Sequence, residues 1–320
     1  GLYSPGLVIL GRGMLYGLSA PVLHFNPSAA ALQSHQKGGS LVCNASSANS
    51  NARNGITCQA SLTATALDAS SNAQVGVAAS QSGTTVTLHG PTLNQNGQQG
   101  LTMVGGSVTI DGAGTINNNG AAQTVAGIFA SGGTLNIGAS AVAGSIEIAN
   151  NANYGVNMAG AGGTLFRVNV HNNGNNGVHI ASLGNFVTLD NAIVDSNSQL
   201  GVYVETAPST VSSVAAATIR QSTVTNNNGG GIFIGSGATL GTAALVQATT
   251  VSGNLGYGVR VAPGVGAVTF AVRACDINTN SLSGVRVEGG APLGNASIRA
   301  SKVHGNGGHQ IDFTAAPSTG

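Results

Sequence analysis

Charged side chains are scarce in this chain, which has 10 Lys and Arg and 9 Asp and Glu among 320 residues and a formal net charge of +1. A protein that binds nucleic acid through phosphate contacts needs a basic face, so the composition argues against nucleic acid as a partner. Trp is absent and aromatic residues make up only 4%. Hydrophobic residues nevertheless amount to 42% and recur with a period, which argues against a disordered chain.

Long apolar runs are also missing, since none reaches the ~18 residues that a membrane-spanning helix needs. The segment from Leu7 to Leu23 comes closest, but several Gly residues, Arg12, Ser19 and Pro21 interrupt it. The sequence therefore predicts no transmembrane segment. Its wealth of Gly, Asn, Ser and Thr is typical of secreted and cell-surface β-solenoids of bacteria, and we expect that location.

Cysteine is limited to three positions, Cys43, Cys58 and Cys275. We predict that Cys43 and Cys58 form a disulfide in an oxidising compartment. This disulfide would hold together the first of the repeating coils into which the chain folds. The alternative for Cys58, which falls in a strand position that other coils fill with apolar residues, is a small core side chain. Cys275 lies in a turn position that other coils fill with Ser or Thr, so we expect a free thiol without a role.

A repeat runs through the chain, in which an Asn is followed four residues later by a Gly anchor that opens a short apolar–variable–apolar strand. The anchors lie 21 to 30 residues apart and are Gly55, Gly76, Gly100, Gly127, Gly155, Gly177, Gly201, Gly231, Gly258 and Gly284, with Gln310 in the eleventh position. Their partners are Asn51, Asn72, Asn96, Asn151, Asn173, Asn197, Asn227, Asn254, Asn280 and Asn306, with Gln123 standing in once. Such a period indicates the stacked coils of a solenoid.

The strand after each anchor alternates apolar and variable residues, as in Val178-His179-Ile180, so one face is buried. A second apolar position lies three residues before the Asn, and a third strand lies further upstream. We therefore predict an all-β fold, a single-stranded right-handed parallel β-helix of about eleven coils. Residues 41–320 form this β-helix, and residues 1–40, which lack the repeat, form an N-terminal cap or assembly segment.

We expect the Asn and Gly residues to build this fold. Asn tolerates the left-handed backbone region that a sharp turn requires, and stacked Asn side chains can bond from coil to coil. Gly serves where the backbone leaves no room for a Cβ. In the first 40 residues, Leu7 to Leu10 is a predicted strand and Ser28 to Gln36 a predicted capping helix. After Phe313 only seven residues remain, too few for a cap, so we expect a partner or a longer protein to cover that end.

The variable residue of each strand points outward, so successive coils build a column on the surface. Within it, an aromatic-to-basic strip is the candidate ligand-binding site and consists of His179, Tyr203, Phe233, Arg260 and Arg286. Aromatic faces stack on sugar rings and Arg grips carboxylates, which points to a saccharide. The alternative is a structural ladder in which Arg286 pairs with Asp312. A second outward column contains Asp190 and Arg220, which we expect to pair.

The Asn…Gly–apolar repeat resembles that of the pectate-lyase-like superfamily of right-handed β-helix proteins, over about residues 41–313. Members of this superfamily include polysaccharide lyases, galacturonan hydrolases, epimerases, tailspikes and non-catalytic surface proteins, so the resemblance implies one of these functions. The paired Asp residues of the hydrolases and the acidic clusters of the calcium-dependent lyases have no counterpart here. The acidic residues are only Asp68, Asp111, Glu147, Asp190, Asp195, Glu205, Asp276, Glu288 and Asp312.

These acidic residues do not suit glycoside hydrolysis. Glu205 and Glu288 share a slot but lie three coils apart, on the order of 14 Å, whereas hydrolysis needs carboxyls within ~5–10 Å. Glu288 and Asp312 lie on adjacent coils, but Arg286 would neutralise Asp312. One catalytic option is a metal-free lyase with Tyr203 or His179 as base and Arg260 neutralising a uronate carboxylate. No histidine spacing indicates a metal site, so we predict no metal and no cofactor.

The sequence thus favours a non-enzymatic extracellular or cell-surface solenoid with a structural or adhesive role. In one form of this hypothesis the protein is its own partner, because the last coil stacks on the N-terminal segment of the next copy and builds a filament. The alternative is a protein that binds an extracellular polysaccharide, or a metal-free polysaccharide lyase, acting through the outward strip.

Overall fold

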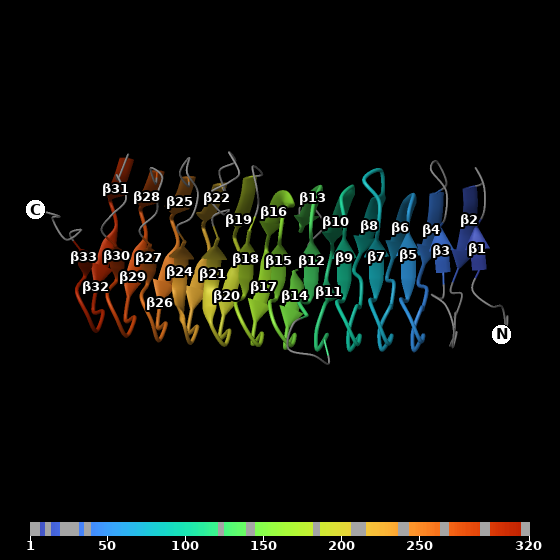
Figure 1. Ribbon diagram of the computed structural model, residues 1–320, viewed down its shortest axis with the longest axis horizontal. Helices are drawn as coiled ribbons and strands as arrows, with labels where there is room; N and C mark the ends of the chain where they lie inside the picture. Colours follow the sequence, from blue (N-terminus) through green and yellow to red (C-terminus); the bar gives the residue numbers. More distant parts are fainter. Residues whose placement is uncertain are drawn as a thin grey trace, which may run out of the picture. The chain divides into compact units, whose positions relative to one another are not determined.

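The computed structural model describes residues 7–9, 14–19, 32–34, 40–120, 125–138, 145–181, 186–205, 216–235, 243–262, 269–288 and 295–314. Within these ranges the regular secondary structure consists of short parallel strands, as predicted for a parallel β-helix (Figure 1). The chain divides into two compact units, Gly1–Asn157 with Arg167–Asn169, and Met158–Phe166 with Val170–Gly320. None of the described segments forms a helix long and apolar enough to cross a membrane.

The first unit places its strands in three parallel sheets. The first sheet has the order β1 (Leu7–Ile9), β3 (Leu32–Ser34), β5 (Ile56–Cys58), β7 (Val77–Ala79), β9 (Leu101–Met103) and β12 (Ile128–Ala130). The second has the order β2 (Met14–Ser19), β4 (Ser40–Asn44), β6 (Ser61–Thr65), β8 (Thr85–His89), β10 (Ser107–Asp111) and β13 (Thr134–Ile137). The third contains β11 (Gly114–Thr115) and β14 (Ile146–Ala149). Residues of both units occur in β15 (Val156–Met158) and β17 (Val168–His171).

The second unit repeats the same three sheets. The first is β18 (Val178–Ile180), β21 (Leu200–Val204), β24 (Gly230–Ile234), β27 (Val259–Val261), β30 (Val285–Val287) and β33 (Ile311–Phe313). The second is β16 (Gly162–Phe166), β19 (Phe186–Asp190), β22 (Ala216–Arg220), β25 (Ala243–Gln247), β28 (Thr269–Arg273) and β31 (Asn295–Arg299). The third is β20 (Ile193–Asp195), β23 (Thr223–Thr225), β26 (Thr250–Ser252), β29 (Asp276–Asn278) and β32 (Lys302–His304).

The eleven anchored strands that the repeat predicts are all present, and β33 follows Gln310 as expected. Thirteen strands occupy the first-sheet position, because β1 and β3 precede the repeat. In register, Leu7 pairs with Leu32 and Leu32 with Ile56. The described part of residues 1–40 thus continues the parallel sheet, whereas the sequence predicts a cap there.

Leu7–Ile9 is a strand, as predicted. The helix predicted from Ser28 to Gln36 is wrong at Leu32–Ser34, which is a strand, and its other residues lie outside the described ranges. The pairing of β3 with β1 on one side and β5 on the other outweighs the weak helical preference of an Ala-rich segment.

The core contains the residues that the alternation assigns to the inside. In β18, β21 and β24 the flanking Val and Ile side chains are fully or almost fully buried, and so is the position three residues before the ladder Asn. At the last coil, Ile311 and Phe313 are 43% and 59% exposed. These side chains are the ones that end-to-end stacking on a second copy would bury, and that association stays a prediction.

A ladder of buried Asn side chains joins the coils of each unit. In the second unit the backbone N–H and Nδ2 of Asn197 both donate to Oδ1 of Asn227, each at 2.9 Å, and Asn227 donates in the same way to Asn254 at 3.0 Å. The spare Nδ2 proton of Asn227 reaches the carbonyl oxygens of Thr225 and Val194, at 2.9 and 3.2 Å. The members of this second-unit ladder are Asn173, Asn197, Asn227, Asn254, Asn280 and Asn306.

The first unit has the same ladder, with one member that the sequence pattern misassigns. Asn51, Asn72 and Asn96 follow the predicted positions, and the next member is Asn119, which bonds to Asn151. Gln123, the predicted stand-in, lies outside the described residues. Asn119 precedes the Gly127 anchor by eight residues instead of four, so the fixed spacing misses it.

The sharp turn lies one residue earlier than predicted. The ladder Asn residues have ordinary backbone angles, and the residue before each of them has the positive φ, for example Asn172 at 55°, Ser196 at 53° and Asn226 at 55°. The left-handed residue orients the following Asn inward. The ladder Asn is therefore selected for its amide and not for tolerance of the left-handed region.

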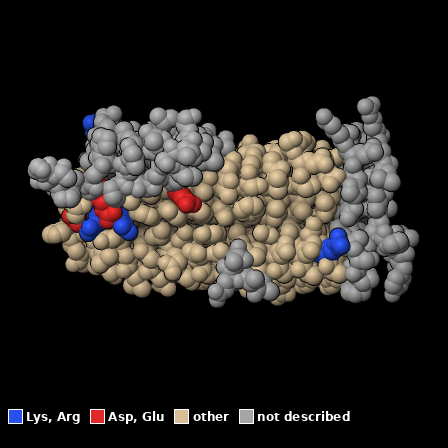
Figure 2. All heavy atoms as spheres, viewed as in Figure 1, with Lys and Arg blue, Asp and Glu red and all other residues tan. Residues whose placement is uncertain are grey.

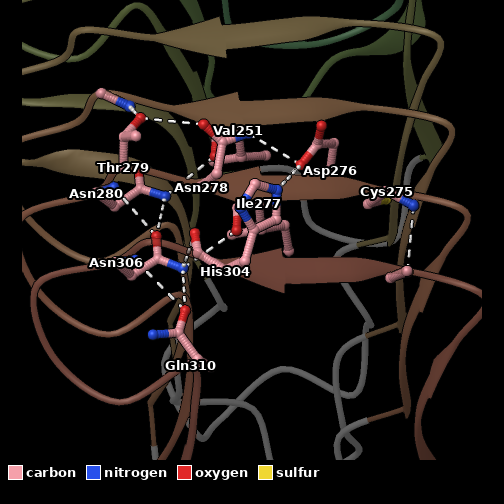
Figure 3. Close-up of polar contacts among 12 residues, drawn as sticks. Val251, Cys275, Asp276, Ile277, Asn278, Thr279, Asn280, His304, Asn306 and Gln310 are labelled. Carbon is pink, nitrogen blue, oxygen red and sulfur yellow. Dashed lines mark hydrogen bonds and ion pairs between the residues drawn. The ribbon is translucent and has the colours of Figure 1, made fainter.

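The ladder also explains the Gly anchors. A Cβ at Gly284 would lie 2.6 Å from Nδ2 of Asn306 and 2.5 Å from Cγ1 of Val303, closer than atoms can approach. At Gln310 no ladder Asn follows among the described residues, and a side chain fits. Gln310 Oε1 accepts hydrogen bonds from Nδ2 and N–H of Asn306 at 2.9 and 3.3 Å, which ends the row (Figure 3).

The predicted Cys43–Cys58 disulfide is wrong in this structure, because both thiols are free. Cys43 lies on β4 of the second sheet and Cys58 on β5 of the first, and both are buried in the core. Burial raises the pKa of each thiol to about 11, so neither is a reactive thiolate at neutral pH. Cys275 is free, as expected, and burial raises its pKa as well.

The ladder makes a quantitative prediction for Asn227→Ala. The substitution removes the acceptor of two buried N–H groups of Asn197, each of which costs ~1–3 kcal/mol when left unsatisfied. We expect the free energy of unfolding in urea to fall by about 3 kcal/mol or more. The matched control is Asn228→Ala, at the exposed neighbouring residue, which should change stability by less than ~0.5 kcal/mol. Equal effects of the two substitutions would contradict the ladder.

Candidate functional site

The predicted outward strip is a continuous column on the first sheet of the second unit. The Cα register pairs His179 with Tyr203, Tyr203 with Phe233, Phe233 with Arg260 and Arg260 with Arg286. The strip therefore has the composition and the order that the repeat predicts.

The aromatic half of the strip is a stack. The His179 and Tyr203 rings lie 5.1 Å apart at 21°, and the Tyr203 and Phe233 rings 5.2 Å apart at 17°. His179 is not the exposed residue that its outward position suggests, since only 7% of it is accessible. Its Nε2 lies 2.7 Å from Oε2 of Glu205, which comes from the adjacent coil. His179 thus supports the strip from below its surface.

The basic half of the strip is tied to carboxylates. Arg260 forms a two-pronged contact with Glu288, through Nε at 3.0 Å and Nη2 at 3.1 Å. Arg286 donates from Nε to the same carboxylate at 3.1 Å and from Nη1 to Asp312 at 3.3 Å, which confirms the predicted Arg286–Asp312 pair. Figure 2 shows the resulting cluster of acidic and basic side chains over β27, β30 and β33.

The role of Glu288 was not predicted, although the sequence contains a signal for it. Glu205 and Glu288 both stand four residues after their anchors, and each bonds to the variable residue of the preceding coil, His179 and Arg260 respectively. A carboxylate in this slot therefore holds the outward side chain one coil earlier. These two Glu residues position the strip and are not a pair of catalytic acids.

A groove of about 250 Å³ lies beside the strip, in the turn that leads into the first sheet. Gly229 and Gly230 form its floor, because their coil provides no side chain between Leu200 on the preceding coil and Tyr257 on the following one. Its remaining walls include Phe233 and Arg260 of the strip, along with Gln199, Ile232 and Leu282. The sequence signal was the run of three glycines ending at the Gly231 anchor, which marks a coil with missing side chains.

Tyr257 links the groove to the basic half of the strip. The guanidinium carbons of Arg260 and Arg286 lie 5.6 and 5.2 Å from the centre of its ring, and that of Arg260 lies 4.9 Å from the Phe233 ring. Such cation–π contacts contribute roughly 0.5–2 kcal/mol each. Arg260 Nη1 makes no hydrogen bond within the described residues, so its N–H groups remain for a ligand.

The second outward column behaves as expected. Arg220 donates to Oδ2 of Asp190 from Nη2 at 2.7 Å and from Nε at 3.0 Å. Asp190 is buried but the Arg220 side chain is half-exposed, so solvent screens the pair and limits its contribution to stability. Among the described residues, no group of three or more His, Cys, Asp and Glu is arranged to hold a metal ion.

Burial lowers the pKa of His179, and the neighbouring Glu205 opposes this effect. The unfolded chain, with an ordinary histidine pKa of ~6.5, binds a proton at a higher pH than the folded chain does. Stability therefore decreases as the pH falls below that value. We expect the urea concentration at the unfolding midpoint of wild type to be lower at pH 5.5 than at pH 7.5. This difference should be smaller in His179→Phe. The exposed His309→Phe serves as control, and a wild-type pH slope in His179→Phe would contradict this assignment.

The sequence matches the family described as "Right handed beta helix region" over residues 55–213 and 154–319. No curated protein matches it. The A-module of the mannuronan C-5 epimerase AlgE4 from Azotobacter vinelandii is similar in structure, with 12% identity and a TM-score of 0.58 over 96% of this chain and 90% of that one. The periplasmic alginate epimerase AlgG has 12% identity and a TM-score of 0.45 over 98% of this chain and 79% of that one. At such identities the similarity concerns the fold, and on the family match this chain belongs to the right-handed parallel β-helix proteins.

Proposed function

We propose that the protein binds an extracellular polysaccharide in the groove beside the outward strip. The groove carries this proposal, because it is lined by the Tyr257 and Phe233 rings and by Arg260, whose Nη1 makes no hydrogen bond within the described ranges. Aromatic rings pack against the apolar faces of sugars, and a guanidinium donates to their oxygens. The lining residues come from successive coils spaced ~4.8 Å apart, a geometry suited to an extended chain of sugars.

The fold similarity supports polysaccharide binding more than the purely structural or adhesive role that the composition favours. The neighbour with the TM-score of 0.58 is a C-5 epimerase of mannuronan, a polysaccharide. A purely structural role gives no reason for a hollow lined by aromatic rings. We propose that the protein acts outside the cytoplasm, at the cell surface or secreted.

The charge balance of the strip limits the ligand. Arg260 and Arg286 face Glu288 and Asp312, so the four charges cancel. A uronate carboxylate has to compete with Glu288 for Arg260, whereas a neutral sugar uses the remaining donors without disturbing the cluster. We expect binding of neutral oligosaccharides to depend little on salt and binding of mannuronan to weaken as salt rises.

Binding is tested with Tyr257→Ala, which removes one wall of the groove. Loss of a stacking ring should weaken oligosaccharide binding by ~1–2 kcal/mol, about five- to thirtyfold. The measurement is isothermal titration with mannuronan and neutral glucan oligosaccharides. Tyr154→Ala is the matched control, because Tyr154 occupies the same position before its anchor, Gly155, but does not line the groove. Wild-type protein that binds no oligosaccharide of either kind would refute the proposal.

A catalytic role is the second candidate, favoured by the position of Tyr203 between His179 and Phe233 in the stack. A base that takes the proton next to a uronate carboxyl, with Arg260 neutralising that carboxylate, is the chemistry common to lyases and C-5 epimerases. The hold of Glu288 on Arg260 opposes this role. If the strip is catalytic, wild type incubated with mannuronan should give unsaturated or epimerised product. Tyr203→Phe and Arg260→Ala should each abolish that product. Product that persists in both variants would exclude the strip as the site of catalysis.

A further inference from the structure

The second sheet of the first unit presents a regular set of hydroxyl groups on its outer face. Ser61 pairs in register with Thr85, Thr85 with Ser107, and Ser107 with Thr134. Two residues further along the same strands, Thr63 pairs with Thr87 and Thr87 with Thr109. We call these two columns the hydroxyl array; its members are Ser61, Thr63, Thr85, Thr87, Ser107, Thr109 and Thr134.

The array is periodic in two directions. Neighbouring strands are ~4.8 Å apart, and residues i and i+2 of one strand are ~6.7 Å apart. The inward neighbours Leu62, Val86, Val108 and Leu135 are 0–1% exposed, so the core holds each strand in place. The array itself contains no charged and no aromatic side chain. It ends where His89 and Asp111 bond to each other at the next outward position.

The part of the chain that the structure describes does not use the hydroxyls of the array. Within the described residues none of them makes a hydrogen bond to another protein group, and all seven side chains are half-buried or exposed. The third side of the same unit differs, because its outward polar groups bond to one another. Asn49 donates to Asp68 at 2.7 Å, Asn94 to Thr115 at 2.9 Å and Asn117 to Glu147 at 2.9 Å. One face is therefore satisfied internally, and the array depends on water.

We propose that the hydroxyl array is an ice-binding surface. Each hydroxyl donates and accepts hydrogen bonds, so the water that solvates it is held at the spacing of the sheet. The γ-methyl groups of the Thr residues separate these positions and restrict the movement of the water molecules between them. Only a ligand that is itself periodic can engage all the positions at once, and a water lattice needs no charge on the protein.

A crystalline polysaccharide is also periodic, but recognition of sugar rings relies on aromatic faces, which the array lacks. The inference is independent of the proposed function, because the groove and the array belong to different units. Each is tested with variants that leave the other unchanged.

The experiment is partition of the purified full chain into slowly growing polycrystalline ice, with a second readout of ice recrystallisation. We expect wild type to be enriched in the ice fraction and to slow recrystallisation. Thr87→Tyr places a bulky ring in the centre of the array and should lose most of this enrichment. Tyr is a good strand former, so folding is preserved, which circular dichroism checks. Thr250→Tyr is the matched control, an outward Thr on β26 of the second unit, and should partition like wild type.

Three outcomes would overturn the proposal. Wild type could be excluded from ice like an ordinary protein, Thr87→Tyr could retain full enrichment, or Thr250→Tyr could lose as much as Thr87→Tyr. Thr87→Val, which keeps the shape and removes the hydroxyl, separates the two features of the array. It should retain less enrichment than wild type, and wild-type enrichment would exclude the hydroxyls as the groups that engage ice.

Discussion

The buried Asn ladder is the constraint on which the rest of this structure depends. Each amide oxygen accepts two hydrogen bonds from the preceding coil, inside a core lined mainly by apolar side chains. A slip of one residue would leave these groups unsatisfied at ~1–3 kcal/mol each and would turn every strand inside out. The ladder therefore fixes the register of each coil against the next. The Gly anchors follow from it, because the amide occupies the space of their missing Cβ.

A fixed register makes the surface as ordered as the core. Side chains that share a slot lie one strand spacing apart, so a single substitution in one coil changes a column at a defined place. The outward strip, the Arg–Glu–Asp cluster and the hydroxyl array all result from this rule in different slots. The groove results from the same rule by omission, since Gly229 and Gly230 interrupt a column that Leu200 and Tyr257 continue.

The sequence was sufficient for features that repeat and insufficient for those that occur once. Eleven anchored strands and the strip could be predicted because each coil restates the same pattern. Asn119 was missed because its coil is longer between the ladder and the anchor, and the strand at Leu32–Ser34 because its partners are distant in sequence. The disulfide prediction rested on cysteine spacing alone, which does not reveal that the two residues belong to different sheets.

The two candidate surfaces differ in what they ask of a ligand. The groove is concave and is lined by both apolar and polar side chains. It therefore selects a molecule by its shape, by ring stacking and by hydrogen bonds from Arg260. The hydroxyl array is a sheet face without charge, and it discriminates only through its spacing. A solenoid suits both, because a coil that keeps its ladder can change its outward residues at little cost in stability. Function in this fold is therefore decided by the outward slots, which here carry aromatic rings, hydroxyls and a few charged side chains that pair with one another.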